Sequence, residues 1–313
     1  MPEITSRTGH LLMCLENLAL PEHSTVAGVR SQELLPPADV QIPSFDTAYQ
    51  TTSFANSARL DFELHRPRRV DFMALAGVKV SGADPEYVRW SALLGQSAAA
   101  KSFAGAAEAV PAQPLVVRGD RERYRWEDPN MWFGGPAPDQ VERLMHSQRL
   151  HTCSHFPGQS RVCRRVRLDL PAPDAAEKSG SYIRVPHVFF GEAFQPRVNF
   201  RWGASYGTLD LSDTQRSPLG VQRGAVRPVL RSFTFDLPFV SDHDAFHRIL
   251  DDWYMRHGSA GRIFVWPFPD KPHLFYSQAF VGTVTKLTGP KIEGFWDADT
   301  DRNSMSFKVE ETF

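Results

Sequence analysis

Three aspartates near the end of the chain have the spacing of cation ligands. Asp297, Asp299 and Asp301 alternate in the segment DADTDRN, as do the first carboxylates of a calcium-binding loop. An EF-hand loop also needs glycine at its sixth position and glutamate at its twelfth, where this chain has Arg302 and Lys308. We therefore interpret the segment as a solvated turn between two strands, with a cation held by three carboxylates as the alternative.

A second set of metal-ligating side chains occurs in the middle of the chain. The segment HTCSHFPGQSRVC contains His151, Cys153, His155 and Cys163, whose side chains are of the kinds that bind zinc or iron. The paired C-x2-C spacing that makes a zinc module recognisable does not occur in this segment. We expect these residues to have ordinary roles in loops and in the core, with a metal site as the alternative, and we predict no cofactor.

The sequence offers no set of residues that can be assigned to catalysis. Serines, histidines and aspartates are plentiful, but sequence alone cannot bring a nucleophile, a base and an acid together. His243 and His247 lie four residues apart without the glutamate of an H-E-x-x-H motif, so we place them on the polar face of a helix. RWGASYGTLD (201–210) contains glycines without a P-loop lysine and is interpreted as a bend. We expect that the protein is not an enzyme.

Aromatic side chains are concentrated in RYRWEDPNMWFGG (123–135). Tyr124, Trp126, Trp132 and Phe133 stand there among polar and turn-forming residues, an arrangement compatible with a platform on which sugar rings stack. The same residue types are also common in protein cores and at subunit contacts. We favour packing for these four residues and keep a glycan or partner contact as the alternative.

The composition excludes several broad classes of protein. The chain has 313 residues, 42% of them hydrophobic, and a formal net charge of −1, which argues against a basic nucleic-acid-binding surface. Its three cysteines cannot form a closed set of disulfides and suggest folding in a reducing compartment. The N-terminal apolar run is interrupted by Glu16 and Asn17, so we expect neither a membrane span nor a secretion signal and predict synthesis in a cytoplasm.

Alternating apolar and polar residues predict a mainly β protein. The pattern occurs at 60–64, 166–170, 233–237 and 305–309, and each of these segments is expected to be a strand with one wet face. The apolar run 70–80 predicts a strand buried on both faces. We also expect a helix at 138–149 and a long exposed loop at 171–180.

One strong helix signal occurs at residues 241–257. Ser241 is a typical N-cap residue with Asp244 three positions later, and Gly258 marks the end of the helix. The apolar residues of this helix are expected on one face, at Phe246, Ile249, Leu250 and Trp253. After a short glycine turn, Ile263–Trp266 is expected to be a buried strand that the following prolines end.

Segments of both halves resemble parts of known proteins. The first-half segments ARLDFELHRPRRVDFMALAGVKVSG (58–82), RRVRLDLPAP (164–173) and YIRVPHVFFGEAFQPRVNFRWGASYGTLD (182–210) resemble discoidin-like jelly-roll proteins encoded among the tail genes of long-tailed bacteriophages. The segment VLRSFTFDLPFVSDHDAFHRILDDWYMRHGSAGRIFVWPFPD (229–270), with the terminal MSFKVEET (305–312), resembles the small domain of distal tail and baseplate hub proteins of the same phages.

These resemblances imply both an architecture and a function. We expect an N-terminal arm at 1–9, a discoidin-like jelly-roll β-sandwich at 10–195, and at 196–313 a smaller β-barrel domain with one capped α-helix. The implied function is that of a structural component of a phage tail tip or baseplate, a homo-oligomer that links the tail hub and distal tail proteins to peripheral fibres. The protein would then be located in the virion. The alternative function is a module that binds a glycan of the bacterial surface.

Overall fold

The computed structural model shows a mainly β protein, as the alternating pattern predicts. Every strand pair with a defined register is antiparallel. The predicted helix at 138–149 and the predicted loop at 171–180 lie outside the described residues. The structure describes residues 10–29, 37–41, 48–50, 58–81, 89–95, 107–114, 151–156, 161–170, 182–216, 222–225, 229–269, 278–292 and 303–312.

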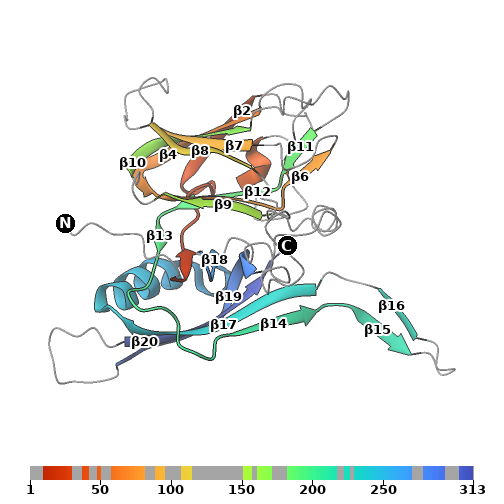
Figure 1. Ribbon diagram of the computed structural model, residues 1–313, viewed down its shortest axis with the longest axis vertical. Coiled ribbons are helices and arrows are strands. Elements are labelled where there is room, and N and C mark those ends of the chain that lie inside the picture. Colours follow the sequence, from red (N-terminus) through yellow and green to blue (C-terminus); the bar gives the residue numbers. More distant parts are fainter. Residues whose placement is uncertain are drawn as a thin grey trace, which may run out of the picture. The chain divides into compact units, whose positions relative to one another are not determined.

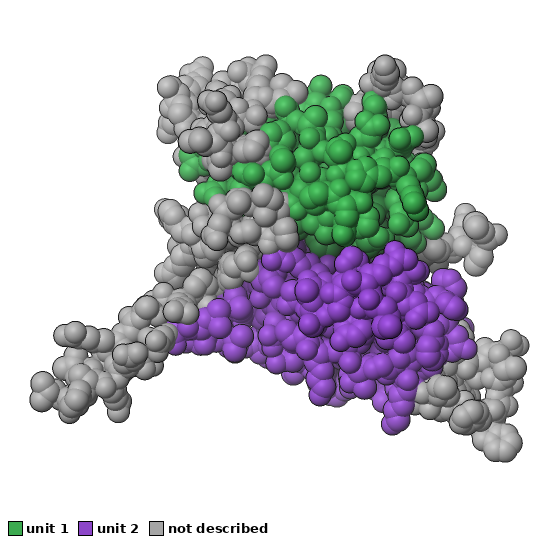
Figure 2. Space-filling view, turned by 180° about the vertical axis from the view of Figure 1, so that it is seen from behind, with its two compact units in different colours: residues 1–9, 16–194, 266–279 green, residues 10–15, 195–265, 280–313 purple. Residues whose placement is uncertain are grey.

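The chain divides into two compact units, which Figure 2 shows in different colours. Unit 1 consists of residues 1–9, 16–194 and 266–279, and unit 2 of residues 10–15, 195–265 and 280–313. Neither unit is one continuous range of the chain, because residues 10–15 group with unit 2 and residues 1–9 and 266–279 group with unit 1, unlike the expected ranges 1–9, 10–195 and 196–313. Local bonds hold residues 10–15 in unit 2: Leu11 donates its backbone N–H to Asn199 Oδ1 at 3.0 Å, and His10 Nδ1 lies 3.1 Å from the Pro196 carbonyl oxygen.

Unit 1 is a β-sandwich built on a five-stranded sheet (Figure 1). The predicted strands at 60–64 and 166–170 are neighbours in this sheet, with Phe62 opposite Val166 and Leu60 opposite Leu168. The strand order of the sheet is β2 (Ser24–Val29), β4 (Ala58–Val70), β10 (Arg161–Leu170), β7 (Arg89–Gly95) and β8 (Ala107–Pro114).

Two three-stranded sheets complete the sandwich. One has the order β12 (His187–Gly191), β5 (Phe72–Ala76) and β9 (His151–His155). The other has the order β3 (Tyr49–Gln50), β11 (Tyr182–Val185) and β6 (Lys79–Ser81), and a short 3-10 helix, η1 (Pro37–Gln41), contacts the ends of β2 and β12. β5 is buried along its whole length, as the apolar run at 70–80 predicts, but the run is not one strand, because β4 ends at Val70 and β6 begins at Lys79.

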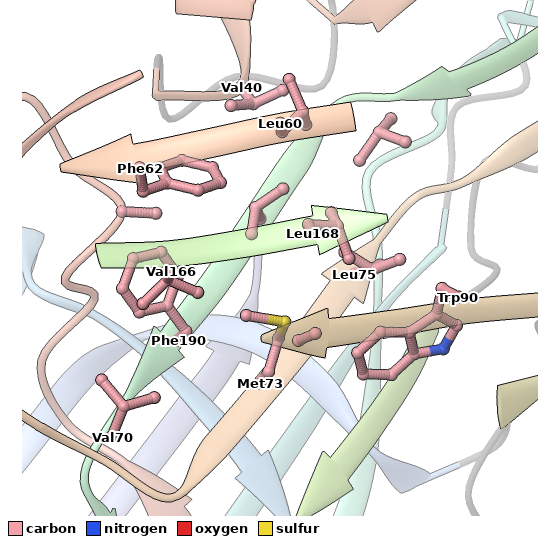
Figure 3. Close-up of a cluster of buried hydrophobic side chains, with 14 of the residues drawn as sticks. Val40, Leu60, Phe62, Val70, Met73, Leu75, Trp90, Val166, Leu168 and Phe190 are labelled. Carbon is pink, nitrogen blue, oxygen red and sulfur yellow. The ribbon is translucent and has the colours of Figure 1, made fainter. Parts of the chain in front are cut away.

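The core of unit 1 lies between these sheets (Figure 3). Leu60, Phe62 and Leu64 of β4 point inward, and Phe62 packs edge-on against Phe190 of β12 with ring centroids 5.1 Å apart. Trp90 is fully buried and donates its indole N–H to Thr152 Oγ1 at 3.1 Å. The β4 residues that alternate with Leu60, Phe62 and Leu64 are directed to the other face of the sheet.

Most of a seven-stranded sheet belongs to unit 2, and a helix packs beside it. The strand order is β13 (Ala193–Phe194), β1 (Leu12–Cys14), β18 (Arg262–Trp266), β19 (Phe280–Ile292), β20 (Asn303–Glu311), β17 (Val229–Val240) and β14 (Ser205–Asp210). The predicted strands at 233–237, 263–266 and 305–309 all belong to it. A barrel is predicted here, whereas the strand order of the described residues has two ends, β13 and β14. A separate two-stranded ribbon is formed by β15 (Asp213–Arg216) and β16 (Gln222–Ala225).

The helix forms where its capping signal predicts it, but it is wound more widely than an α-helix. The Ser241 hydroxyl accepts the Asp244 N–H at 3.1 Å and donates to the Asp244 carboxylate at 2.8 Å. The segment η5 (His243–Tyr254) is π-helical, and α2 (Met255–His257) and η6 (Gly258–Ala260) follow it. With more residues per turn, the buried positions recur every fourth residue, at Ala245, Ile249 and Trp253. Phe246 and Leu250, expected on the buried face, are only partly buried.

Stacked aromatic rings and one buried ion pair hold the centre of the unit 2 sheet. Phe235 of β17 stacks on Phe233 at 4.7 Å and on Phe307 of β20 at 5.2 Å between ring centroids. Glu311 is almost completely buried and accepts the backbone N–H and the Nε–H of Arg231, each at 2.9 Å. Such a buried carboxylate is tolerated because a cation and several donors surround it.

Replacement of Phe62 by alanine should destabilise unit 1 by about 3–5 kcal/mol, because the substitution leaves a cavity against Phe190. Denaturant unfolding followed by tryptophan fluorescence, which includes the buried Trp90, would measure this loss. Val162→Ala is the matched control, since 60% of Val162 is exposed and its loss should change the free energy of unfolding by at most about 0.5 kcal/mol. Equal effects of the two substitutions would contradict the described core.

Candidate functional site

A wide bulge interrupts β4 where it pairs with β10. Arg165 lies opposite Glu63 and Cys163 lies opposite Arg68, so the four residues from Leu64 to Pro67 face Arg164 alone. Pro67 has no N–H to contribute to a sheet, and proline within a strand is found at such bulges or at edges. The bulge separates β4 from β10 locally and turns the side chains of its exposed residues away from the regular ladder.

The bulge and the chain before β2 enclose the larger of two polar hollows described in unit 1. This hollow, which we call the bulge pocket, has a volume of about 320 Å³, and its lining residues are Glu22, His23, His65, Arg66 and Arg68. The volume is at the lower end of the range of about 300–1,000 Å³ that is typical of small-molecule sites.

Backbone hydrogen bonds fix the two sides of the bulge pocket to each other. The N–H of His65 donates to the carbonyl oxygen of His23 at 2.8 Å, and His65 Nδ1 lies 3.2 Å from the carbonyl oxygen of Glu22. The N–H of His23 in turn donates to the Leu20 carbonyl oxygen at 2.9 Å. Because both sides are held by the main chain, the pocket exists before any ligand binds.

Charged groups of both signs lie at the bulge pocket. His23 Nε2 lies 3.4 Å from Glu16 Oε1 and 3.2 Å from Glu22 Oε1, and Arg68 Nη2 lies 3.8 Å from Glu16 Oε1. The lining itself contains one glutamate and two arginines, and Glu16 contacts it from outside. His23 Nε2 is buried, so His65 and the two arginines are the donors that can reach a ligand.

A second hollow follows the bulge pocket along β4. It has a volume of about 240 Å³ and lies over the outer face of β2, β4 and β10. Ion pairs cross from β4 to β10 on this face: Arg167 holds Asp61 through two hydrogen bonds of 2.6 and 3.0 Å, and Arg165 Nη2 lies 3.3 Å from Glu63 Oε2. Like the bulge pocket, this second hollow is lined by both carboxylate and guanidinium groups.

The residues that the sequence singles out for glycan or calcium binding lie outside the described residues. The first set is the aromatic group Tyr124, Trp126, Trp132 and Phe133, and the second is Asp297, Asp299 and Asp301. Both remain predictions.

The described part of the histidine and cysteine set does not form a metal site. Cys153 and His155 share one face of β9, whereas Cys163 lies in β10, which belongs to a different sheet. Burial raises the pKa of the Cys163 thiol to about 12 and also raises the pKa of Cys153, so in the metal-free protein both thiols are protonated at neutral pH. No group of three potential ligands occurs within the described ranges.

One segment has the spacing of a nucleophile elbow but not its structural context. Gly203, Ser205 and Gly207 fit the G-x-S-x-G pattern, which in hydrolases joins a strand to a helix by a sharp turn. Here Ser205 is the first residue of β14, so the motif begins a strand instead of ending one. The interpretation of this segment as a bend holds only for its first residues, where Gly203 adopts a φ of 106°.

Sequence reasoning did not identify the bulge pocket. Three of its residues, His65, Arg66 and Arg68, stand in HRPRR directly after the alternating strand at 60–64, and this segment contains no ligand motif. The available signal was Pro67, because a proline within a strand pattern indicates a bulge, and bulges often redirect side chains toward a site.

Across the described part of the chain, no helix is both long enough and apolar enough to cross a membrane. This finding concerns helices alone.

Comparison with known proteins gives distant structural similarities only. No protein-family model and no curated protein matches the chain. Among solved structures, a chitosan-binding module of a Paenibacillus chitosanase/glucanase is 9% identical with a TM-score of 0.37, covering 56% of this chain and 99% of the module. A family 32 carbohydrate-binding module of NanJ from Clostridium perfringens, in complex with galactose, is 10% identical with a TM-score of 0.34, covering 55% and 93%.

A third similar structure is a GH29 fucosidase from Ruminococcus gnavus, which is 8% identical with a TM-score of 0.36. The match covers 57% of this chain but only 27% of the fucosidase chain. Carbohydrate-binding proteins thus occur among the structural neighbours. The likeness is too distant to transfer a function to this chain, and none of these comparisons identifies a phage tail protein.

The stability of the protein should fall as the pH decreases from about 6.5 to about 4. Burial lowers the pKa of His155 from its ordinary value of 6.5 to about 4, so the unfolded chain binds this proton more readily than the folded chain. The stabilisation that depends on neutral His155 is complete above pH 6.5 and is lost through this window. Thermal unfolding of His155→Gln, which cannot be protonated, should show a weaker pH dependence than that of the wild type, and identical profiles would contradict the shift.

Proposed function

We propose that unit 1 is a carbohydrate-binding module whose ligand occupies the bulge pocket. The single observation that carries this proposal is the composition of the pocket, in which the carboxylate of Glu22, the guanidinium groups of Arg66 and Arg68 and two imidazole rings line one hollow. A sugar hydroxyl group both donates and accepts hydrogen bonds, so a polyhydroxylated ligand matches a lining that offers both donors and acceptors.

The extended form of the site supports a ligand longer than one sugar unit. The bulge pocket and the second hollow follow each other along β4, and Glu63 and His65 stand two positions apart on the same face of that strand. An oligosaccharide lying along β4 would therefore meet fixed hydrogen-bonding groups over both hollows. The proposed activity is binding without turnover, since we assign no nucleophile or general acid in either hollow.

The test is binding of a glycan array followed by calorimetric titration with the best ligand. Arg66→Ala and His65→Ala should each weaken binding about 10-fold to 100-fold, because a hydrogen bond from a charged or strongly polar group contributes about 1.5–3 kcal/mol. Arg197→Ala, an exposed arginine of unit 2, is the control and should bind as the wild type does.

Two outcomes would overturn this assignment. Failure to bind any glycan would contradict the proposed function. Loss of binding with Trp132→Ala, together with unchanged binding of the two pocket variants, would contradict the pocket and assign the sugar to the aromatic segment at 123–135.

A second candidate function is that of a structural component of a phage tail tip or baseplate, located in the virion. The observation that favours an assembly role is the exposed apolar surface of unit 2 around β14, where Trp202, Tyr206 and Leu209 face solvent. Partner proteins in this role would be hub, distal tail and fibre proteins, and the glycan-binding unit would attach the particle to its host. The phage setting itself comes from the sequence resemblance.

The assembly role predicts that the protein is a stoichiometric part of a particle. Mass spectrometry of purified virions that encode this chain should detect it in several copies per particle, at a ratio to the hub protein that does not change after density-gradient centrifugation. Its absence from purified particles, with the free chain present in the lysate, would contradict this second function and leave the carbohydrate-binding proposal intact.

A further inference from the structure

The outermost strand of the unit 2 sheet leaves its backbone unpaired on one side. β14 pairs with β17 on one side, from Ser205 opposite Thr234 to Asp210 opposite Val229, and it ends the strand order within the described residues (Figure 1). All six of its residues are exposed. A free strand edge of this length presents a row of N–H and C=O groups that can pair with another chain.

The side chains at this edge do not protect it. Soluble proteins usually block a free edge with lysine, proline or an inward-pointing charge, whereas β14 contains only one charged residue, Asp210 at its end. Tyr206 and Leu209 are each 41% exposed, and Leu211 directly after the strand is also 41% exposed. Trp202, in the turn before β14, is fully exposed. An edge with this composition is typical of an interface.

The opposite end of the same sheet restricts what can pair with β14. That end is β13, which has two residues and offers too short a ladder to accept a six-residue strand. A head-to-tail continuation of the sheet from copy to copy is therefore disfavoured. The same edge of a second copy has the required length, and an interface between two identical edges closes on itself with two-fold symmetry.

We propose that β14 pairs antiparallel with β14 of a second copy about a two-fold axis at Thr208, which joins two sheets into one. This register places Tyr206 opposite Asp210 of the second copy, Leu209 opposite its Gly207, and the two Thr208 residues opposite each other. It keeps the two Asp210 carboxylates out of direct opposition, and cross-strand threonine pairs are favourable. The inference deepens the assembly role by naming its first partner, and it is independent of carbohydrate binding.

The first test measures the mass of the purified full chain by sedimentation equilibrium at micromolar concentrations. The wild type should have twice the monomer mass of 35.3 kDa. Leu209→Lys should raise the dissociation constant of the dimer about tenfold or more, because the lysine removes apolar contact and charges the edge. The control is Met255→Lys, since Met255 is 74% exposed on α2 and should leave the dimer unchanged.

The second test examines the two-fold axis directly through Thr208→Cys. Directly opposed residues of antiparallel strands have Cα atoms about 4.5–5.5 Å apart, a separation that a disulfide can span. Mild oxidation should therefore convert Thr208→Cys into a covalent dimer, while the wild type and Met255→Cys stay monomeric on a denaturing gel.

Each contrary outcome has a distinct meaning. A monomeric wild type, a dimer that Leu209→Lys leaves unchanged, or a Thr208→Cys variant that does not crosslink would overturn the pairing. A wild type that is monomeric alone but binds purified hub protein would overturn self-pairing and preserve the assembly role. Sugar titrations of Leu209→Lys would show whether carbohydrate binding is retained, which we expect because the bulge pocket lies in unit 1.

Discussion

The bulge in β4 is the constraint on which the account of this protein depends. β4 must pair with β10 and supply Leu60, Phe62 and Leu64 to the core, so its odd-numbered residues are committed to the outer face. Pro67 cannot take part in a regular ladder, and the extra residues that accommodate it widen the strand locally. The same strand therefore anchors the sandwich and opens the pocket, and neither property can change without affecting the other.

The outer face of unit 1 is better explained by recognition than by stability. The pairs Arg167–Asp61, Arg165–Glu63 and Arg59–Asp169 are partly exposed, and exposed ion pairs typically contribute only about 0–1 kcal/mol each. Their main effect is to hold long side chains in fixed positions, which lowers the entropic cost of binding a ligand. Because each arginine of these three pairs is matched by a carboxylate, the pairs add no net charge to the outer face. Such a face favours a neutral ligand rich in hydroxyl groups over an ion.

Unit 2 combines a firmly held centre with an unprotected edge. Stacked rings at Phe233, Phe235 and Phe307 and the Arg231–Glu311 pair concentrate contacts in the middle of the sheet. Within the described ranges β14 has one strand neighbour and exposes all of its residues, so its stability depends on β17 or on a further chain. The proposed carbohydrate site involves residues of unit 1 and the proposed pairing involves residues of unit 2, so the two proposals can be tested separately.

Local patterns in the sequence predicted the elements but not the way they combine. Alternation located the strands that became β4, β10, β17 and β20, and the Ser241 cap located the helix. The π-helical winding of η5 was not predicted. The spacing of apolar residues indicates a helix, but it does not show whether each N–H bonds to the carbonyl oxygen four or five residues earlier. The barrel in unit 2 was expected from the resemblance to phage proteins. Closure of a sheet into a barrel depends on pairing between strands that are distant in the sequence, which local patterns do not specify.

The candidate site was harder to predict from the sequence than the fold. Each residue of the bulge pocket is ordinary by itself, and the pocket arises only when the segment at Glu22 and His23 is brought against β4. The long-range hydrogen bond from the His65 N–H to the His23 carbonyl oxygen creates this arrangement, and nothing in the local sequence encodes it. The D-x-D-x-D segment, which is visible in the sequence, lies outside the described residues, and its role stays a prediction.

The most direct measurement of the central claim is titration of the isotope-labelled protein with a bound oligosaccharide, followed by backbone amide NMR. The account predicts that the largest shifts occur at Glu22, His23, His65, Arg66 and Arg68, with smaller shifts at Asp61 and Glu63 along the second hollow. Shifts that leave these residues unchanged and concentrate elsewhere in the chain would contradict it.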